Sequence, residues 1–449
     1  MKSTKAADIL HGSIWKQLLI FFFPIMLGTF FQQVYNTADT IIVGRYVGKE
    51  ALAAVGGSPF YIMNIFISFS IGLSSGCSVI IAQYFGAAKK KHLSKAIHTS
   101  LALSILLGIA ISVSVYLSSE PLLRWLRVPA DAFDYSVRYL KIVSLGFSLT
   151  MVYNMCTAIF RAIGDSKTPL YFLMVCAVLN IGLNILLVAI FRLNVAGVAI
   201  ATVISQFVSV FLSFFSLMRT KEIYRVRLSE LKIYGPLVPK LIRTALPRAL
   251  QSTYFSLANV ILQSSINLLG TSAVAGWAID RKIEVVFSMI IGSFGVAITV
   301  FTAQNFGARQ YDRVRRGLVV CFQINIVITV ILSVVTWLWG PSLSRFFSDD
   351  PLVLEHAVTI IRFLSPFYLL YVAYELIACY LYGIGISFTP MLITSFGICV
   401  FRILWIFIVI GKTPTLYRIL GCYPVSWGLT SLLFLIYFKC SKRRKALLN

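Results

Sequence analysis

Asp39 is the residue of this chain whose type and position are best suited to chemistry. It lies in the stretch between Phe30 and Gly57, with apolar residues before and after it. Ionisable groups at membrane depth are costly and usually face a protein interior or a watery cavity. Asp39 is therefore the first candidate for a functional residue. The alternative is a helix cap near the membrane surface, beside Asn36 and Thr37.

The composition indicates which elements must position this acid. The chain has 449 residues, of which 58% are hydrophobic and 12% charged, and its mean hydropathy is +0.85. A soluble domain carries about twice that charged fraction, and membrane-spanning helices need apolar runs of about 20 residues, which recur here. We expect an all-α polytopic membrane protein with twelve transmembrane helices. The predicted spans are residues 17–43, 52–82, 96–118, 135–160, 169–191, 195–218, 238–268, 273–303, 318–340, 356–381, 390–410 and 419–438.

The basic residues lie mainly in the connections on one side of these spans. With the N-terminus inside, the inner segments hold 25 Lys and Arg residues and the outer segments hold eight. Short cytoplasmic loops carry such an excess. We therefore expect a multi-pass protein of the cell membrane with both termini cytoplasmic. The same placement argues against a nucleic-acid partner, despite a formal net charge of +24.

The sequence repeats itself after about 221 residues. Six spans fall in each half, so the two six-helix bundles form a parallel repeat, which is the usual plan of an alternating-access transporter. We expect an N-terminal lobe at 1–218, a cytoplasmic linker at 219–237 and a C-terminal lobe at 238–449. The matching segments are AQYFGA at 82–87 with AQNFGA at 303–308, RAIGDSKTP at 161–169 with YGIGISFTP at 382–390, GKEALAAV at 48–55 with GTSAVAGW at 270–277, and Pro24 with Pro247.

With these motifs in order, the chain resembles the multidrug and toxic compound extrusion family over nearly its whole length. The first-span pattern QQVYNTADTIIVG and the Asn-rich fifth span, followed by VAGVAIAT, belong to the same resemblance. It implies two six-helix bundles that open alternately. It also implies an antiporter that expels organic compounds, often cationic and amphipathic, in exchange for Na⁺ or H⁺.

The resemblance assigns roles to five residues of the N-terminal half. Asp39 matches the acid of the family's first helix, and Pro24 matches the proline at which family models let that helix bend; a proline within a helix permits such a kink. Asn180, Asn184 and Thr202 match the positions that accompany the acid in members with a cation site. Asn180 and Asn184 are four residues apart, so they share one helix face. The alternative is that the two amides only hold helices together by hydrogen bonds.

The chain departs from the family pattern at Asn184, where members with a cation site carry a second acid. One carboxylate among amides can carry a proton, whereas Na⁺ gains from additional carboxylate charge. We therefore expect H⁺ coupling through Asp39. A burial that penalises the charged carboxylate would help such an acid to load and release a proton. The alternative is Na⁺ held by Asp39, Asn180, Asn184 and Thr202, and no other metal is expected.

The C-terminal half carries intramembrane charges of both signs, for which buried ion pairs are the simplest explanation. In one branch of the family an acid of the tenth span takes part in coupling; Tyr371 stands there, and Glu375 lies one turn later. Unpaired arginine in a cavity would favour an anionic or zwitterionic substrate. Candidate cavity residues are Tyr35, Phe60, Asn154, Glu284, Glu375 and Arg402.

Three other functions compete with drug antiport. The first is a flippase for lipid-linked oligosaccharides or cell-wall precursors, from the same superfamily. The second is a membrane-embedded enzyme, which is disfavoured because the sequence lacks HExxH and P-loop motifs. The third is a channel, which the two-lobe repeat disfavours. We expect no catalytic residues and no cofactor apart from the transported ion. The expected partners are a small-molecule substrate and the lipid bilayer, and the expected state is a monomer.

Overall fold

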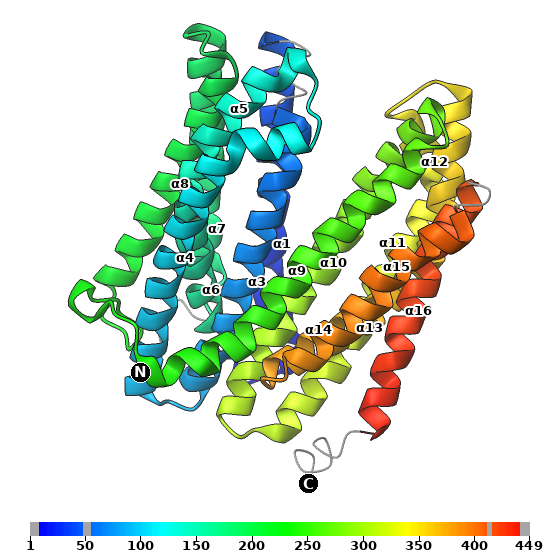
Figure 1. Ribbon diagram of the computed structural model, residues 1–449. Helices are drawn as coiled ribbons and strands as arrows, with labels where there is room; N and C mark the ends of the chain where they lie inside the picture. Colours follow the sequence, from blue (N-terminus) through cyan, green and yellow to red (C-terminus); the bar gives the residue numbers. More distant parts are fainter. Residues whose placement is uncertain (1–8, 48–54, 411–414, 441–449) are drawn as a thin grey trace. The chain divides into compact units, whose positions relative to one another are not determined.

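A computed structural model describes residues 9–47, 55–410 and 415–440, and all regular structure in these ranges is helical (Figure 1). The repeated segment at 48–54 and both ends of the chain lie outside the described residues. The first half holds α1 (Ile14–Tyr46), α3 (Ser58–Gly86), α4 (Lys90–Trp125), α5 (Ala130–Leu145), α6 (Phe147–Ala162), α7 (Lys167–Asn184), the π-helix η1 (Ile185–Ile190) and α8 (Asn194–Arg219). Two 3₁₀ turns follow, η2 (Leu228–Glu230) and η3 (Gly235–Leu237). The second half holds α9 (Val238–Asn267), α10 (Thr271–Gly307), α11 (Tyr311–Arg345), α12 (Pro351–Leu364), the 3₁₀ turn η4 (Ser365–Phe367), α13 (Tyr368–Gly383), α14 (Phe388–Thr394), the π-helix η5 (Ser395–Val400), α15 (Phe401–Trp405), the π-helix η6 (Ile406–Ile410) and α16 (Leu416–Cys440).

The helices confirm the prediction of an all-α membrane protein. Within the described residues, ten helical segments are long and apolar enough to cross a membrane, and the bent pair α5 and α6 makes an eleventh. With α9, which is 30 residues long, the structure is consistent with twelve spans. Most helices extend beyond their predicted ends; α4, for example, covers Lys90–Trp125 rather than 96–118. Helical hydrogen bonding continues past the apolar core of a bilayer, which is only about 30 Å thick.

The internal repeat is visible in the backbone of the two halves. Ala88 and Arg309, which follow the two AQ-x-FGA motifs, both adopt positive φ angles, of 53° and 60°. Gly164 and Gly385 do the same in the next matched turn, at 94° and 86°. The π-helices η1 and η6 begin 221 residues apart, at Ile185 and Ile406. The predicted parallel repeat is therefore confirmed.

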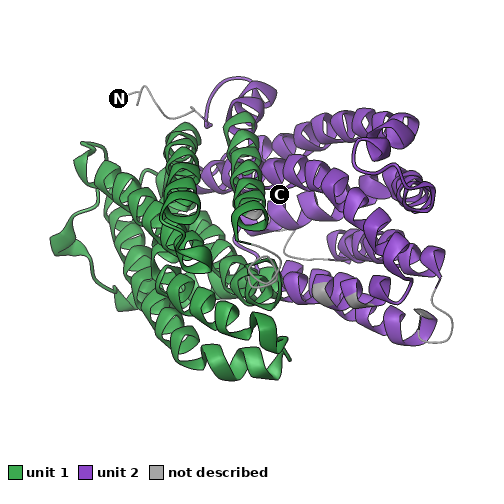
Figure 2. Ribbon diagram, turned by 90° about the horizontal axis from the view of Figure 1, so that it is seen from above, with its two compact units in different colours: residues 1–8, 23–253 green, residues 9–22, 254–449 purple. Residues whose placement is uncertain are grey.

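The chain divides into two compact units (Figure 2). Among the described residues, unit 1 comprises Phe23–Thr253, and unit 2 comprises Ile9–Phe22 with the chain from Tyr254 onward. The start of α1 belongs to unit 2, and there Phe22 stacks on Phe294 of α10, with ring centroids 4.0 Å apart. Helices α1 and α9 each contribute residues to both units. The lobes at 1–218 and 238–449 and the linker at 219–237 stay a prediction.

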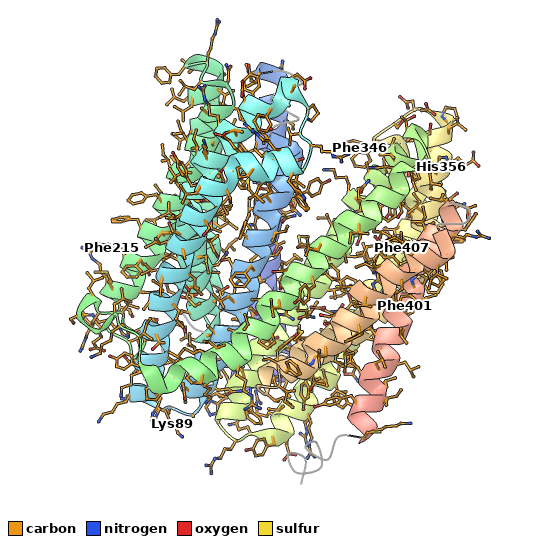
Figure 3. The ribbon with its side chains drawn as sticks, viewed as in Figure 1. Lys89, Phe215, Phe346, His356, Phe401 and Phe407 are labelled. Atoms are coloured by element: carbon orange, nitrogen blue, oxygen red, sulfur yellow. The ribbon has the colours of Figure 1, made fainter. Side chains whose placement is uncertain are left out.

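Large apolar side chains remain exposed along the helices, as expected of surfaces that face lipid. The labelled side chains of Phe215 and Phe407 project away from their helices in Figure 3. Phe407 is 73% exposed in the isolated chain. Bilayer acyl chains are as apolar as these side chains, so their exposure carries no cost in a membrane.

Within unit 1, α3 and α9 approach each other at Gly72. A Cβ atom placed on Gly72 would lie 2.6 Å from both the Ala249 Cα and the Arg248 carbonyl oxygen. Both neighbours are backbone atoms, so neither can rotate away. Small residues at helix crossings permit this kind of close backbone packing in membranes.

We expect Gly72→Ala to destabilise the protein by about 1–3 kcal/mol, as overpacking of a well-packed interior does. The melting temperature of the purified protein should fall. Gly292→Ala is the matched control, because nothing lies within 4 Å of a Cβ placed there, and alanine raises helix propensity by about 0.5–1 kcal/mol. Equal melting temperatures for the Gly72 variant and the wild type would contradict the close crossing.

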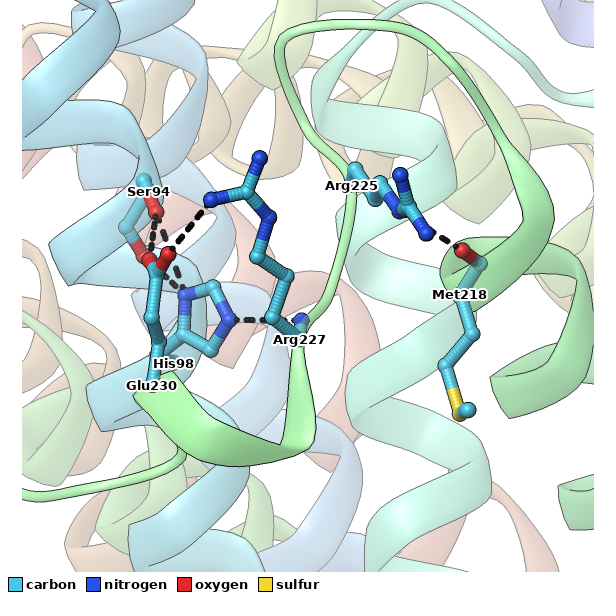
Figure 4. A network of polar contacts seen from close by, with 6 residues as sticks. All are labelled: Ser94, His98, Met218, Arg225, Arg227 and Glu230. Atoms are coloured by element: carbon cyan, nitrogen blue, oxygen red, sulfur yellow. Dashed lines mark hydrogen bonds and ion pairs between the residues drawn. The ribbon is translucent and has the colours of Figure 1, made fainter.

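The linker between α8 and α9 is held against the base of α4 by a network of polar contacts (Figure 4). His98 is fully buried and accepts a hydrogen bond at Nε2 from the Arg227 backbone N–H, at 3.0 Å. Its Nδ1 lies 2.7 Å from the Ser94 carbonyl oxygen. Because Nε2 accepts, the neutral ring carries its proton on Nδ1 and donates it to that carbonyl. Glu230 accepts from both Ser94 Oγ, at 3.2 Å, and Arg227 Nη1, at 3.0 Å.

We expect His98→Ala to release the linker, because the Arg227 backbone N–H then loses its buried acceptor, a loss of about 1–3 kcal/mol. Faster hydrogen exchange and easier proteolysis at 220–237 would report it. His92→Ala, which replaces an exposed histidine six residues earlier, should leave the linker protected. The hydrogen bond from Arg227 also lowers the pKa of Glu230. Its contribution is present above the ordinary carboxyl range and is lost as the pH falls through the lowered value.

Candidate functional site

Asp39 lies within a chain of hydrogen bonds that joins α1 to α7. Asn184 Nδ2 donates to Asp39 Oδ1 at 2.5 Å and also to Asn180 Oδ1 at 2.8 Å. Both asparagines are fully buried, and their spacing of four residues puts them on one face of α7. The structure therefore brings together three of the four residues predicted for the coupling site.

Thr202 joins this cluster through Tyr35 rather than through Asp39. The Thr202 hydroxyl donates to the Val198 carbonyl oxygen at 3.0 Å, so its one proton is used. The side chain of Tyr35 lies beside that of Thr202. Tyr35 also interacts electrostatically with Asp39 and Tyr139. Thus Tyr35, predicted only as a cavity residue, lies at the polar cluster itself.

Tyr139 of α5 is a neighbour of Asp39 that the sequence analysis missed. It is 5% exposed and interacts electrostatically with the acid. Tyr139 belongs to an apolar cluster that also contains Val43 of α1 and Val198 of α8. This cluster excludes water from one side of the polar group. A buried tyrosine hydroxyl usually needs a polar partner, but the burial of Tyr139 is visible only in the structure.

Two atoms of the cluster have no hydrogen-bond partner among the described residues. They are Asn180 Nδ2, a donor, and Asn184 Oδ1, an acceptor. A buried polar atom without a partner costs about 1–3 kcal/mol. The site therefore leaves one hydrogen-bond donor and one hydrogen-bond acceptor unused. It can form one hydrogen bond to an added acceptor and one to an added donor.

The backbone changes its helical form at this site. Asn184 is the last residue of α7, and the π-helix η1 begins at Ile185. Single π-helical turns within α-helices occur frequently at functional sites. The π-helix η6 occupies the matched position of the second half, but it follows Trp405 rather than an asparagine. The site chemistry therefore differs between the halves, although the backbone is repeated.

Pro24 lies inside α1, which runs from Ile14 to Tyr46 as one helix. Proline has no backbone N–H, so the Ile20 carbonyl lacks its usual helical donor. The hinge role assigned to Pro24 stays a prediction.

The acids of the second half lie in different settings. In α10, Glu284 pairs with Arg281 one turn earlier, while Asp280 is 2% exposed and its Oδ2 has no hydrogen-bond partner. Glu375 of α13 accepts a weak hydrogen bond from Cys379 Sγ at 3.5 Å. At the residue that matches Asp39, the second half has Ile261 or Leu262 in place of an acid.

Within the described residues, no three His, Cys, Asp or Glu side chains gather as a metal site would require.

Arg402 is the largest fully buried side chain of unit 2, with 1% of its surface exposed. Its Nε donates to Ser426 Oγ at 3.1 Å, and its guanidinium lies over the Tyr423 ring, 4.2 Å from the centroid. Arg402 Nη2 has no hydrogen-bond partner among the described residues. A guanidinium with a free N–H can bind a carboxylate or phosphate oxygen.

The two remaining candidates from the sequence lie apart from these clusters. Asn154 of α6 donates to Ser70 Oγ of α3 at 3.0 Å, a contact that holds two helices together. Phe60 is 47% exposed and packs edge-on against Tyr61.

These features define a class of protein: a helical membrane transport protein built from two repeated halves, with a buried acid–amide cluster in one half. A family model described as MatE matches residues 24–186 and 247–408. The chain belongs to this family, which confirms the resemblance seen in its motifs. Members are transporters, so the chain is a transporter and not an enzyme.

Known proteins show the same relationship. The chain is 28% identical over 445 residues to "Probable multidrug resistance protein YoeA" of Bacillus subtilis, covering 96% of this chain and 95% of the relative. It is 26% identical over 351 residues to the "FAD transporter" of Shewanella oneidensis, covering 77% of each. Its fold matches a solved structure described as the outward-facing conformation of a multidrug resistance MATE family transporter, with a TM-score of 0.90, 23% identity and complete coverage of both chains.

Proposed function

We propose that this transporter is a monomeric antiporter of the cell membrane, with both termini cytoplasmic, which exports organic compounds in exchange for H⁺ by alternating access. Cationic and amphipathic compounds are the proposed substrates. The observation that carries the proposal is the buried chain of hydrogen bonds from Asp39 through Asn184 to Asn180. The printed name of the Bacillus subtilis relative, a probable multidrug resistance protein, supports the substrate class.

The orientation of the Asn184 amide supports H⁺ rather than Na⁺ as the coupling ion. Its NH₂ group, not its oxygen, faces the Asp39 carboxylate. A hard cation needs oxygen ligands, and carboxylates and carbonyls are the suitable ones. The Thr202 hydroxyl is also engaged, since it donates to the Val198 carbonyl oxygen. A Na⁺ site would therefore require the amide to turn before the ion binds, whereas a proton binds to one carboxylate oxygen and any turn of the amide follows.

Protonation of Asp39 would change what α1 and α7 offer each other. The carboxylate now accepts from Asn184 Nδ2, whereas the protonated acid gains an O–H donor. Asn184 Oδ1, which has no partner, becomes a suitable acceptor if the amide rotates by about 180°. Proton binding thus reverses the hydrogen bond at the junction of α1, α7 and the π-helix η1. Asn184 donates to the carboxylate, whereas the protonated Asp39 donates to Asn184. This is a local two-state element that a pH gradient can bias.

A second candidate function, export of anionic or zwitterionic metabolites, is favoured by Arg402. Its unpartnered Nη2 is buried in unit 2, and an oxyanion would satisfy it. One relative is named FAD transporter, and FAD carries anionic phosphates. Flipping of lipid-linked precursors has no comparable support.

Reconstitution into liposomes tests the proposal. A pH gradient and a Na⁺ gradient are imposed separately, and efflux of a cationic dye and an anionic dye of similar size is followed. We expect cationic dye transport driven by the pH gradient alone. Transport of the anionic dye only would favour the second candidate. Equal flux in the absence of any ion gradient would contradict coupled antiport.

A further inference from the structure

An open groove of about 740 Å³ lies in unit 1, along one face of α5 and beside Tyr116 of α4. Its charged lining comes from Asp131, Asp134, Arg138 and Lys141, at helix spacings that place them on one face. The opposite face of α5 is buried in the unit. The groove is separate from the Asp39 cluster, whose α5 member Tyr139 is buried and does not line the groove.

The lining changes its chemistry in a fixed order along the helix. Asp131 and Asp134 come first, next to the loop that precedes α5; Arg138 and Lys141 follow, and Leu145 ends the groove. With a rise of 1.5 Å per residue, Asp134 and Arg138 lie about 6 Å apart along the axis. Lys141 Nζ pairs with Glu120 Oε1 at 2.8 Å, whereas no ion pair engages Asp131, Asp134 or Arg138 among the described residues.

The apolar end of the groove continues onto a surface that faces lipid. Tyr116 belongs to a row of exposed apolar residues on one face of α4, with Leu106, Ile109 and Val113, which are 57%, 51% and 51% exposed. Their spacing of three or four residues makes a continuous stripe. α5 begins at the upper end of unit 1 in Figure 1, near the end of α4, and the stripe leads from there toward the middle of α4. The groove therefore runs from the water-facing loop to the apolar bilayer.

We propose that this groove binds a phospholipid with a zwitterionic ethanolamine headgroup. From water inward, such a lipid presents an ammonium group, a phosphate and acyl chains, which is the order of the acids, the bases and the apolar stripe in the groove. The carboxylates of Asp131 and Asp134 accept from the ammonium N–H groups. The Arg138 guanidinium matches phosphate oxygens, while Lys141 stays paired with Glu120. The acyl chain lies along Leu145 and the stripe of α4.

Lipid binding to the full chain tests this assignment. The purified, delipidated protein is equilibrated with mixed micelles of phosphatidylethanolamine and phosphatidylglycerol at equal concentration, and bound lipid is counted by native mass spectrometry. We expect the wild type to retain phosphatidylethanolamine preferentially. Arg138→Gln should weaken its binding by about tenfold, the effect of one charge-assisted hydrogen bond. Asp134→Asn should remove the preference over phosphatidylglycerol, whose headgroup lacks an ammonium.

Two further variants separate the groove from general surface charge. Arg124→Gln removes one positive charge near the end of α4, outside the groove, and should leave lipid retention unchanged. The double variant Asp134→Arg with Arg138→Asp keeps the net charge but reverses its order, and should lose the preference. All these side chains are on exposed or half-exposed positions, and unchanged melting temperatures would show that the variants fold. Equal binding of phosphatidylglycerol by the wild type, or an equal loss in Arg124→Gln, would overturn the proposal.

Discussion

Asp39→Asn is expected to abolish transport driven by a pH gradient while leaving the protein folded. Asparagine keeps the size of the side chain and an oxygen that can accept from Asn184 Nδ2, so the contact between α1 and α7 survives. It cannot bind or release a proton at ordinary pH. We expect the initial rate of pH-driven efflux in liposomes to fall by on the order of 100-fold, which corresponds to about 2.7 kcal/mol.

The matched control for this experiment is Glu355→Gln, which removes an exposed acid on α12 of unit 2. It should transport at the wild-type rate. Substrate binding by Asp39→Asn should persist, because the proposed loss concerns the driving ion. Wild-type efflux by Asp39→Asn under a pH gradient would refute coupling at Asp39, and so would a matching loss in Glu355→Gln.

Asn184→Asp is expected to change the ion on which transport depends. The new carboxylate would replace an N–H donor next to Asp39, so two acids would lie within hydrogen-bond distance. Like charges this close cannot both ionise readily, and one of them retains a proton unless a cation neutralises the pair. The oxygen of Asn180 would add a ligand. We expect the variant to gain transport driven by a Na⁺ gradient, with at least about a tenfold rise over wild type, or about 1.4 kcal/mol.

Asn154→Asp provides the comparison for that variant. It makes the same chemical change elsewhere in unit 1. Asn154 is hydrogen-bonded to Ser70 and lies outside the Asp39 cluster. It should gain no dependence on Na⁺. If Asn184→Asp behaved as the wild type in both gradients, Asn184 would have only a packing role. The alternative that the two amides merely hold helices together would then be favoured.

Much of the fold followed from local properties of the chain. Hydropathy located the spans because a chain that crosses the bilayer must form its backbone hydrogen bonds within its own segment. Each span is therefore one long apolar helix, which a run of apolar residues reveals. The repeat of about 221 residues was readable as sequence, and the same interval reappears in the backbone at Ala88 and Arg309. The composition of units 1 and 2 was not predictable in this way. The packing of Phe22 against Phe294 depends on side-chain contacts between segments that are distant in sequence.

Part of the candidate site was also predictable from local properties of the chain. Asn180 and Asn184 share a helix face because of their spacing, and Asp39 stood out as a costly acid in an apolar segment. Tyr139 was missed because tyrosine is common in membrane helices, and only the packing of α5 against α1 and α8 makes it a neighbour of the acid.

The sequence by itself determined that this chain spans a membrane many times, that its halves repeat, and that only the first half carries an acid at the repeated position of its first helix. Only the tertiary structure decided that Asn184 turns its NH₂ group toward Asp39, that the Thr202 hydroxyl donates to Val198, and that Arg402 is fully buried. Apolar periodicity is a property of each helix alone. The partner of a buried polar group depends on how neighbouring helices rotate and slide against one another.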